Sequence, residues 1–130
     1  MSTATTIVCF FSDSPAGRAA VEVTALQART RDAGIVLLDA YTRQPPASQA
    51  AKDAATRLEE DGLEVEMVLG GTHRSAGTAA VWLADERNAA ALVLGLRRRS
   101  PVGKLVLGSD AQDALLGADC PVIAVKAHED

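Results

Sequence analysis

Apolar residues gather into short runs along the chain, each about as long as a β-strand. Four runs are continuous and mostly rich in β-branched or bulky residues, and they cover residues 7–11, 35–38, 91–94 and 122–125. Continuous apolar strands are typical of a sheet that helices cover on both faces. A fifth run, 64–69, begins in strict alternation. One of its faces should meet water, so we expect it at an edge of the sheet.

Helical segments with recognisable ends separate these runs. Ser14 followed by a proline predicts the N-cap of the first helix, and Ala33-Gly34 predicts its end. The last helix is predicted to begin at Ser109, which lies at capping-box spacing from Gln112. Between them, one helix is expected after Pro45-Pro46 as far as Gly62, and another over 76–87.

Each helical segment carries apolar residues at helical spacing, which predicts the face that it buries. These residues are Ala16, Ala19, Ala20, Val23 and Leu26 in the first, Ala47, Ala51, Ala54, Ala55 and Leu58 in the second, Ala80, Leu83 and Ala84 in the third, and Leu115 and Leu116 in the fourth. Alanine-rich faces let a helix approach a sheet closely.

Strands and helices therefore alternate regularly from one end of the chain to the other. This pattern predicts a parallel sheet with right-handed crossovers and helices on both faces, a three-layer α/β/α fold. The length of 130 residues suits one domain, which we expect to span residues 1–130.

Composition and charge exclude several classes of protein. Two cysteines are too few for a disulfide scaffold, and the longest later apolar stretch, 89–96, is too short to span a membrane. A net charge of -4 and 3% aromatic residues argue against binding to nucleic acid. The chain begins without the basic segment of a secretion signal. We expect a cytoplasmic domain that binds neither nucleic acid nor membrane.

The last apolar run suggests self-association. If Val122, Ile123, Ala124 and Val125 form an edge strand, their free backbone groups can pair with a second copy. We therefore expect a homodimer through this strand. The alternative is a sheet order that places the strand inside the sheet.

The segment from Gly95 to Gly108 is the best candidate for chemistry. It carries four basic residues and no acidic one, namely Arg97, Arg98, Arg99 and Lys104. Basic side chains that lead into a helix N-terminus provide the charge and the amide donors that an oligophosphate needs. The alternative is a solvated basic surface followed by an ordinary helix cap.

The same segment resembles a known family. Gly95, Gly108-Ser109 and the closing residues 120–125 are similar to the carboxyl-terminal half of universal stress proteins, and residues 14–20 match the start of that family. The resemblance implies the adenine nucleotide alpha hydrolase-like fold with strand order 3-2-1-4-5. It also implies dimers paired through the last strand and, in many members, ATP held between the loops after the first and fourth strands.

The ATP-binding members carry the motif Gly-x2-Gly-x9-Gly-[Ser/Thr], which this chain matches except at one position. Gly95, Gly108 and Ser109 are present, but Arg98 replaces the second glycine. In a nucleotide complex, we expect Gly95, Gly108 and Ser109 to form the backbone cradle and Arg97, Arg98 or Lys104 to supply the counter-charge. Ser12, Asp13 and Ala40 are expected on the adenosine side, and Leu94 is a further candidate for the site. Ser12 stands where the family has an aspartate, and Asp110 would repel a phosphate.

Three functions are consistent with these residues. The first is a stress-response or signalling protein that binds ATP or another adenine nucleotide, with or without Mg²⁺. The second is a nucleotide-free dimeric interaction module with the same fold. The third is a slow ATP hydrolase, for which neither a general base nor a second metal-ligating carboxylate can be assigned. The sequence indicates no catalytic residue, and His73 and His128 lack the partners of a metal site.

Overall fold

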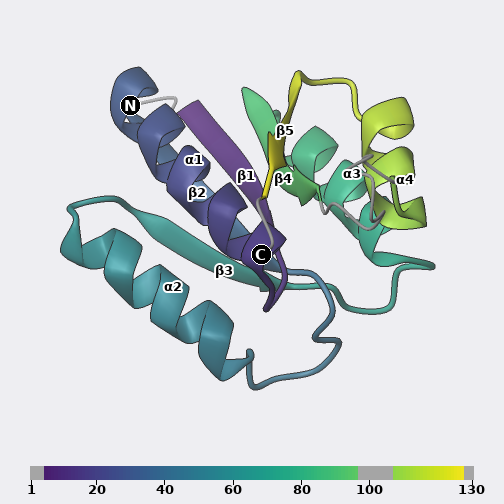
Figure 1. The fold of residues 1–130 in the computed structure, drawn as a ribbon, viewed down its shortest axis with the longest axis horizontal. Coiled ribbons are helices and arrows are strands. Elements are labelled where there is room, and N and C mark those ends of the chain that lie inside the picture. The colour runs from purple at the N-terminus through teal and green to yellow at the C-terminus, as the bar shows by residue number, and fades with distance from the viewer. Residues whose placement is uncertain (1–4, 97–106, 128–130) are drawn as a thin grey trace.

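The computed structural model describes residues 5–96 and 107–127, which form alternating strands and helices (Figure 1). In chain order, these elements are β1 (Thr5–Phe11), α1 (Pro15–Arg31), β2 (Ala33–Asp39), α2 (Gln49–Glu60), β3 (Val65–Leu69), α3 (Ala76–Glu86), β4 (Ala91–Leu96), α4 (Ser109–Gly117) and β5 (Val122–Lys126). No helix in this part of the chain combines the length and apolar character needed to cross a bilayer.

All five strands are parallel and form one sheet in the order β3-β2-β1-β4-β5, which confirms the predicted fold class. The strand at 64–69 lies at one edge, as its alternation predicts, and β5 lies at the other. β1 pairs with β2 over its full length, Thr5 to Phe11, but with β4 only from Ile7 to Cys9. The two central strands therefore separate toward their carboxyl ends.

The sheet divides the core into two layers. One layer packs α1 and α2 against alternate strand residues such as Cys9 and Leu37, and the other packs α3 and α4 against Val8 and Leu38. Figure 1 shows α3 and α4 side by side, away from α1 and α2. Strands that are buried on both faces explain the continuous apolar runs of the sequence.

Serine side chains cap three of the four helices. Ser14 Oγ accepts a hydrogen bond from the backbone N–H of Gly17, and Ser48 and Ser75 cap α2 and α3 in the same way. The buried carboxylate of Asp39 also accepts the backbone N–H of Ser48 at 2.8 Å, which fixes the start of α2. These bonds satisfy donors that the first turn of a helix leaves free.

Four predictions about the helices were wrong. α1 ends at Asp32, which takes the left-handed conformation at φ 53°, and Gly34 lies in β2. α4 begins at Ser109 as predicted, but its N-cap is Gly108, so Ser109 does not form the expected capping box. Leu26 is 56% exposed, and Leu115 and Leu116 are exposed as well. Alanines fill the positions against the sheet, so these leucines lie on the outer helix faces.

The two cysteines occupy different environments. Cys9 is fully buried in β1, and this burial raises the pKa of its thiol to about 12. Cys120 is half-buried immediately before β5, and burial together with the charges of Asp85 and Asp119 raises the pKa of its thiol. Neither thiol is activated as a nucleophile, because the thiolate form is disfavoured at both positions.

Candidate functional site

A cleft of about 480 Å³ opens at the carboxyl ends of β1 and β4. It lies where the connections from neighbouring strands leave in opposite directions, the usual ligand site of an open α/β sheet. Its walls come from the end of each central strand, the turn into α1, Tyr41 after β2 and the first turn of α4. The lining residues are Phe10, Ser12, Asp13, Ser14, Ala16, Tyr41, Leu94, Gly95, Leu96, Gly108, Ser109, Asp110 and Ala111.

Two glycines bring α1 against the ends of the central strands. A Cβ atom on Gly95 would lie 2.1 Å from the carbonyl oxygen of Ala16, and one on Gly17 would lie 1.8 Å from that of Ser12. Neither contact is possible for a larger residue without backbone movement. These glycines therefore allow the close approach of two backbones beside the cleft, which Gly95 itself lines.

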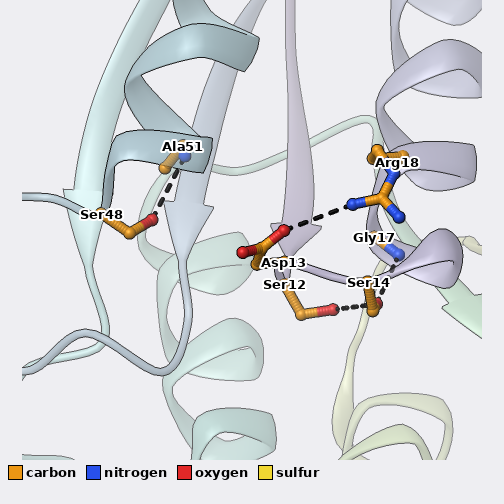
Figure 2. Close-up of polar contacts among 7 residues, drawn as sticks. All are labelled: Ser12, Asp13, Ser14, Gly17, Arg18, Ser48 and Ala51. Carbon is orange, nitrogen blue, oxygen red and sulfur yellow. Dashed lines mark hydrogen bonds and ion pairs between the residues drawn. The ribbon is translucent and has the colours of Figure 1, made fainter.

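The turn after β1 is held by its own serines, as Figure 2 shows. The Ser12 and Ser14 hydroxyls are 2.9 Å apart, and Ser14 Oγ also accepts the N–H of Gly17 at 3.0 Å. Arg18 donates to Asp13 at 3.3 Å, and both side chains are exposed. Ser12 is thus positioned in the cleft wall, whereas the carboxylate of Asp13 is directed toward the start of α1.

The start of α4 differs from the starts of the other three helices. Its N-cap, Gly108, has no side chain, and within the described part of the chain no side chain accepts a hydrogen bond at this end. Gly108, Ser109, Asp110 and Ala111 all line the cleft. Among the described residues no side chain occupies these N–H donors, and they and the positive end of the helix dipole lie at the cavity. This arrangement fits a phosphate group.

Tyr41 joins two walls of the cleft. Its ring packs edge-to-face on Phe10 with centroids 5.8 Å apart, and its hydroxyl donates to Asp110 Oδ2 at 2.7 Å. Burial and the adjacent Asp110 carboxylate both raise the pKa of Tyr41, which keeps the hydroxyl protonated. This contact connects the segment after β2 with α4, across 69 residues of sequence.

The structure brings six of the predicted site residues to the cleft and separates one from it. Those that line it are Ser12, Asp13, Leu94, Gly95, Gly108 and Ser109. Ala40 is 4% exposed and belongs to the core beneath α3, and its neighbour Tyr41 lines the cleft instead. Arg97, Arg98 and Lys104 lie outside the described residues.

Sequence reasoning missed several lining residues. The sequence pattern places Phe10 in an apolar run and gives Tyr41 no role, and Leu96 lies within the candidate segment without being singled out. The signal for Tyr41 was its position immediately after the expected end of the second strand. Asp110 was noted only for its charge, although its carboxylate also accepts the backbone N–H of Gly77 at 2.9 Å.

Comparisons with known proteins agree with this architecture. The model of the universal stress protein family matches residues 3–126. A universal stress protein of Mycolicibacterium smegmatis is 38% identical, over 94% of this chain and 98% of that protein. The chain belongs to the universal stress protein family.

Solved structures of universal stress proteins have the same fold. One from Archaeoglobus fulgidus is 29% identical with a TM-score of 0.76, and the match covers 95% of this chain and 98% of that one. Another, solved in complex with cAMP, is 25% identical with a TM-score of 0.66 and covers 98% and 100% of the two chains. The similarity therefore extends over essentially the whole domain.

The described residues provide no cluster for a tightly held metal ion. Among them, no group of three or more histidine, cysteine, aspartate or glutamate side chains is close enough to hold one. His73 instead packs against Trp82, with ring centroids 5.1 Å apart.

Proposed function

We propose that this universal stress protein binds an adenine nucleotide, ATP or AMP, in the cleft between β1 and β4. Nucleotide occupancy would serve a stress-response or signalling role in the cytoplasm. Ser109 and the free N–H groups of α4 would contact the phosphates, and Ser12 and the wall formed by Phe10 and Tyr41 would face the adenosine. Arg97, Arg98 and Lys104 supply basic charge in the segment that precedes α4.

The observation that carries this proposal is the uncapped start of α4 at a cleft of nucleotide size. A volume of about 480 Å³ is within the roughly 300–1,000 Å³ typical of small-molecule sites. Serine side chains occupy the equivalent donors of α1, α2 and α3. At α4 these donors meet the cavity, where a phosphate can accept them. The relative solved with cAMP supports an adenine nucleotide as the ligand.

Calorimetric titration tests the proposal directly. ATP or AMP added to the purified protein should release or absorb heat and raise the unfolding temperature, because a ligand of the native state stabilises it. No heat and no thermal shift at millimolar nucleotide would contradict the proposal.

A matched pair of variants locates the site. Ser109 and Gln49 are both the first residue of a helix, but only Ser109 lines the cleft. Ser109→Glu places a carboxylate where the phosphate would bind and should weaken nucleotide binding at least about tenfold. Gln49→Glu makes a similar change at α2 and should leave the affinity unchanged. Equal effects would contradict the assignment of the site.

A nucleotide-free interaction module remains the second candidate. It is favoured by Asp110, an acidic residue of the cleft wall in the first turn of α4, where it would repel a phosphate. Titration separates the two candidates, since the module would bind neither ATP nor AMP.

We also propose a homodimer formed through β5. This strand lies at the edge of the sheet, and its Ala124 and Lys126 side chains are exposed. A second copy related by a two-fold axis would pair with its free backbone groups.

A further inference from the structure

Asp110 is held by donors from two other parts of the fold. Its Oδ1 accepts the backbone N–H of Gly77, in the first turn of α3, at 2.9 Å. Its Oδ2 accepts the Tyr41 hydroxyl at 2.7 Å. Both oxygens are therefore occupied, and the carboxylate has a fixed position in the first turn of α4, within the wall of the cleft.

Tyr41 is placed so that its hydroxyl reaches this carboxylate. Its ring packs on Phe10 at the end of β1, while the side chain remains 61% exposed at the mouth of the cleft. The hydroxyl of a neutral tyrosine donates a short, charge-assisted hydrogen bond to a carboxylate. The bond therefore offsets part of the negative charge of Asp110.

The fixed carboxylate lies at the end of the cleft that suits phosphate. Two like charges about 4 Å apart repel one another by about 1 kcal/mol in bulk water and by about 4 kcal/mol at the effective dielectric near a protein surface. Each negative charge added beside this carboxylate should therefore weaken binding at least severalfold. A second and a third phosphoryl group add negative charge at this end. A nucleoside monophosphate adds the least, and the free donors of α4 can satisfy its oxygens.

We propose that Asp110 is a specificity-determining residue that makes the cleft select adenine nucleotides with few phosphates, and that Tyr41 offsets part of the charge of this carboxylate through its hydrogen bond. This inference rests on the proposed function. It predicts opposite changes in nucleotide selectivity when the Asp110 carboxylate and the Tyr41 hydroxyl are removed. A diffuse effect of surface charge would not distinguish these two hydrogen-bonded partners in this way.

The test compares ATP with AMP by calorimetry in the presence of EDTA. Asp110→Asn keeps an oxygen for the Gly77 N–H but removes the charge, so the ratio of the dissociation constants, ATP over AMP, should fall about tenfold. Tyr41→Phe keeps the ring on Phe10 but removes the donor, so the same ratio should rise about threefold. A purely structural role would change both affinities equally and leave the ratio constant.

Asp113→Asn is the matched control. Asp113 is one turn further along α4 and accepts the hydroxyl of Ser75 at the start of α3, but it does not line the cleft. Removal of its charge should leave the ratio unchanged, and an equal fall in this variant would overturn the inference.

The remaining outcomes separate this inference from the proposed function. Binding of neither nucleotide by the unaltered protein overturns both. Binding of AMP with a ratio that neither Asp110→Asn nor Tyr41→Phe alters overturns the specificity role alone. If Asp110→Asn unfolds, Tyr41→Phe decides, and an unchanged ratio in that variant overturns the inference.

Discussion

Glycines around the cleft serve two different purposes. Gly95 and Gly17 are required by packing, because a side chain at either position would collide with a backbone carbonyl, that of Ala16 in α1 or that of Ser12. Gly108 has open space around the position of its missing Cβ and an ordinary φ of -70°. Among the described residues, neither packing nor backbone conformation requires a glycine there. The proposed contact of this backbone with a ligand would account for it.

The open position of Gly108 gives opposite predictions for stability and binding. In Gly108→Ser, the hydroxyl can accept an N–H of α4, as Ser48 does in α2 from a similar backbone conformation. We expect a free energy of unfolding higher by a few tenths of a kcal/mol. Nucleotide affinity should fall, because the new side chain occupies the donors. Chemical denaturation and calorimetry measure the two effects.

Gly95→Ala is the complementary variant. Its methyl group would meet the Ala16 carbonyl, so we expect a loss of about 1–3 kcal/mol in stability whether or not nucleotide is present. Gly108→Ser with unaltered affinity would show that the donors of α4 do not bind the ligand.

At this scale, the sequence predicted residues whose role is local. Gly95, Gly108 and Ser109 could be found because their spacing along the chain is itself the signal. Tyr41 could not, since its partner Asp110 is 69 residues away and only the fold brings them together. Ala40 follows the last residue of β2, and its side chain enters the core beneath α3 rather than the cleft.

Helices and strands were predicted with accurate starts and less accurate faces. Ser14-Pro15 marks the start of α1 because a cap and a proline act within a single turn. The buried faces depend on how closely a helix approaches the sheet. Ala20 and Ala28 occupy that contact in α1, so the larger Leu26 remains outside. In α4, likewise, the small Ala114 is buried, whereas the larger Leu116 is 86% exposed.

One ion pair connects the edge strand β3 with the end of α3. Arg87, the C-cap of α3, donates two hydrogen bonds to the carboxylate of Glu66 at 2.6 and 2.7 Å. The guanidinium lowers the pKa of Glu66 below its ordinary value of 4.5. Both side chains are partly exposed, at 30% for Arg87 and 54% for Glu66, so the pair should contribute only about 0.2–1 kcal/mol.

This pair gives a pH-dependent prediction for Glu66→Gln. A carboxyl whose pKa is lowered by folding stabilises the native state above its unfolded pKa and loses that contribution as the pH falls. The variant should therefore be less stable than the unaltered protein at pH 7, and the difference should shrink below about pH 4.5. Urea denaturation at pH 7 and pH 3 measures this change. A difference that grows toward low pH would contradict the assignment.

The topology of the whole molecule was the most predictable feature. Regular alternation of strands and helices restricts the chain to a parallel sheet, and the family resemblance supplied its order. The short pairing of β1 with β4, from Ile7 to Cys9, was not predictable, because both strands remain apolar beyond it. That early separation opens the cleft. The location of the site can therefore be predicted from the fold, but the shape of the cleft cannot.

Association through β5 is testable at the same scale. Ala124→Lys adds a charge to an exposed position beside Lys126, so two copies paired across a two-fold axis would bring like charges together. We expect sedimentation to give twice the 13.5 kDa mass for the unaltered protein and the single mass for the variant. Thr56→Lys, on the exposed face of α2, should remain a dimer. If the unaltered protein sediments only as a monomer at micromolar concentration, this result would contradict the proposed dimer.

The unequal burial of the two thiols makes the protein a selective target for chemical labelling. A maleimide reagent is excluded from Cys9 in the native fold and can reach only Cys120, more slowly than an unperturbed thiol. Cys120 precedes β5, at the opposite end of the sheet from the cleft. A fluorophore attached there would therefore report assembly by energy transfer between copies, and nucleotide could be titrated into the same sample without steric interference from the dye.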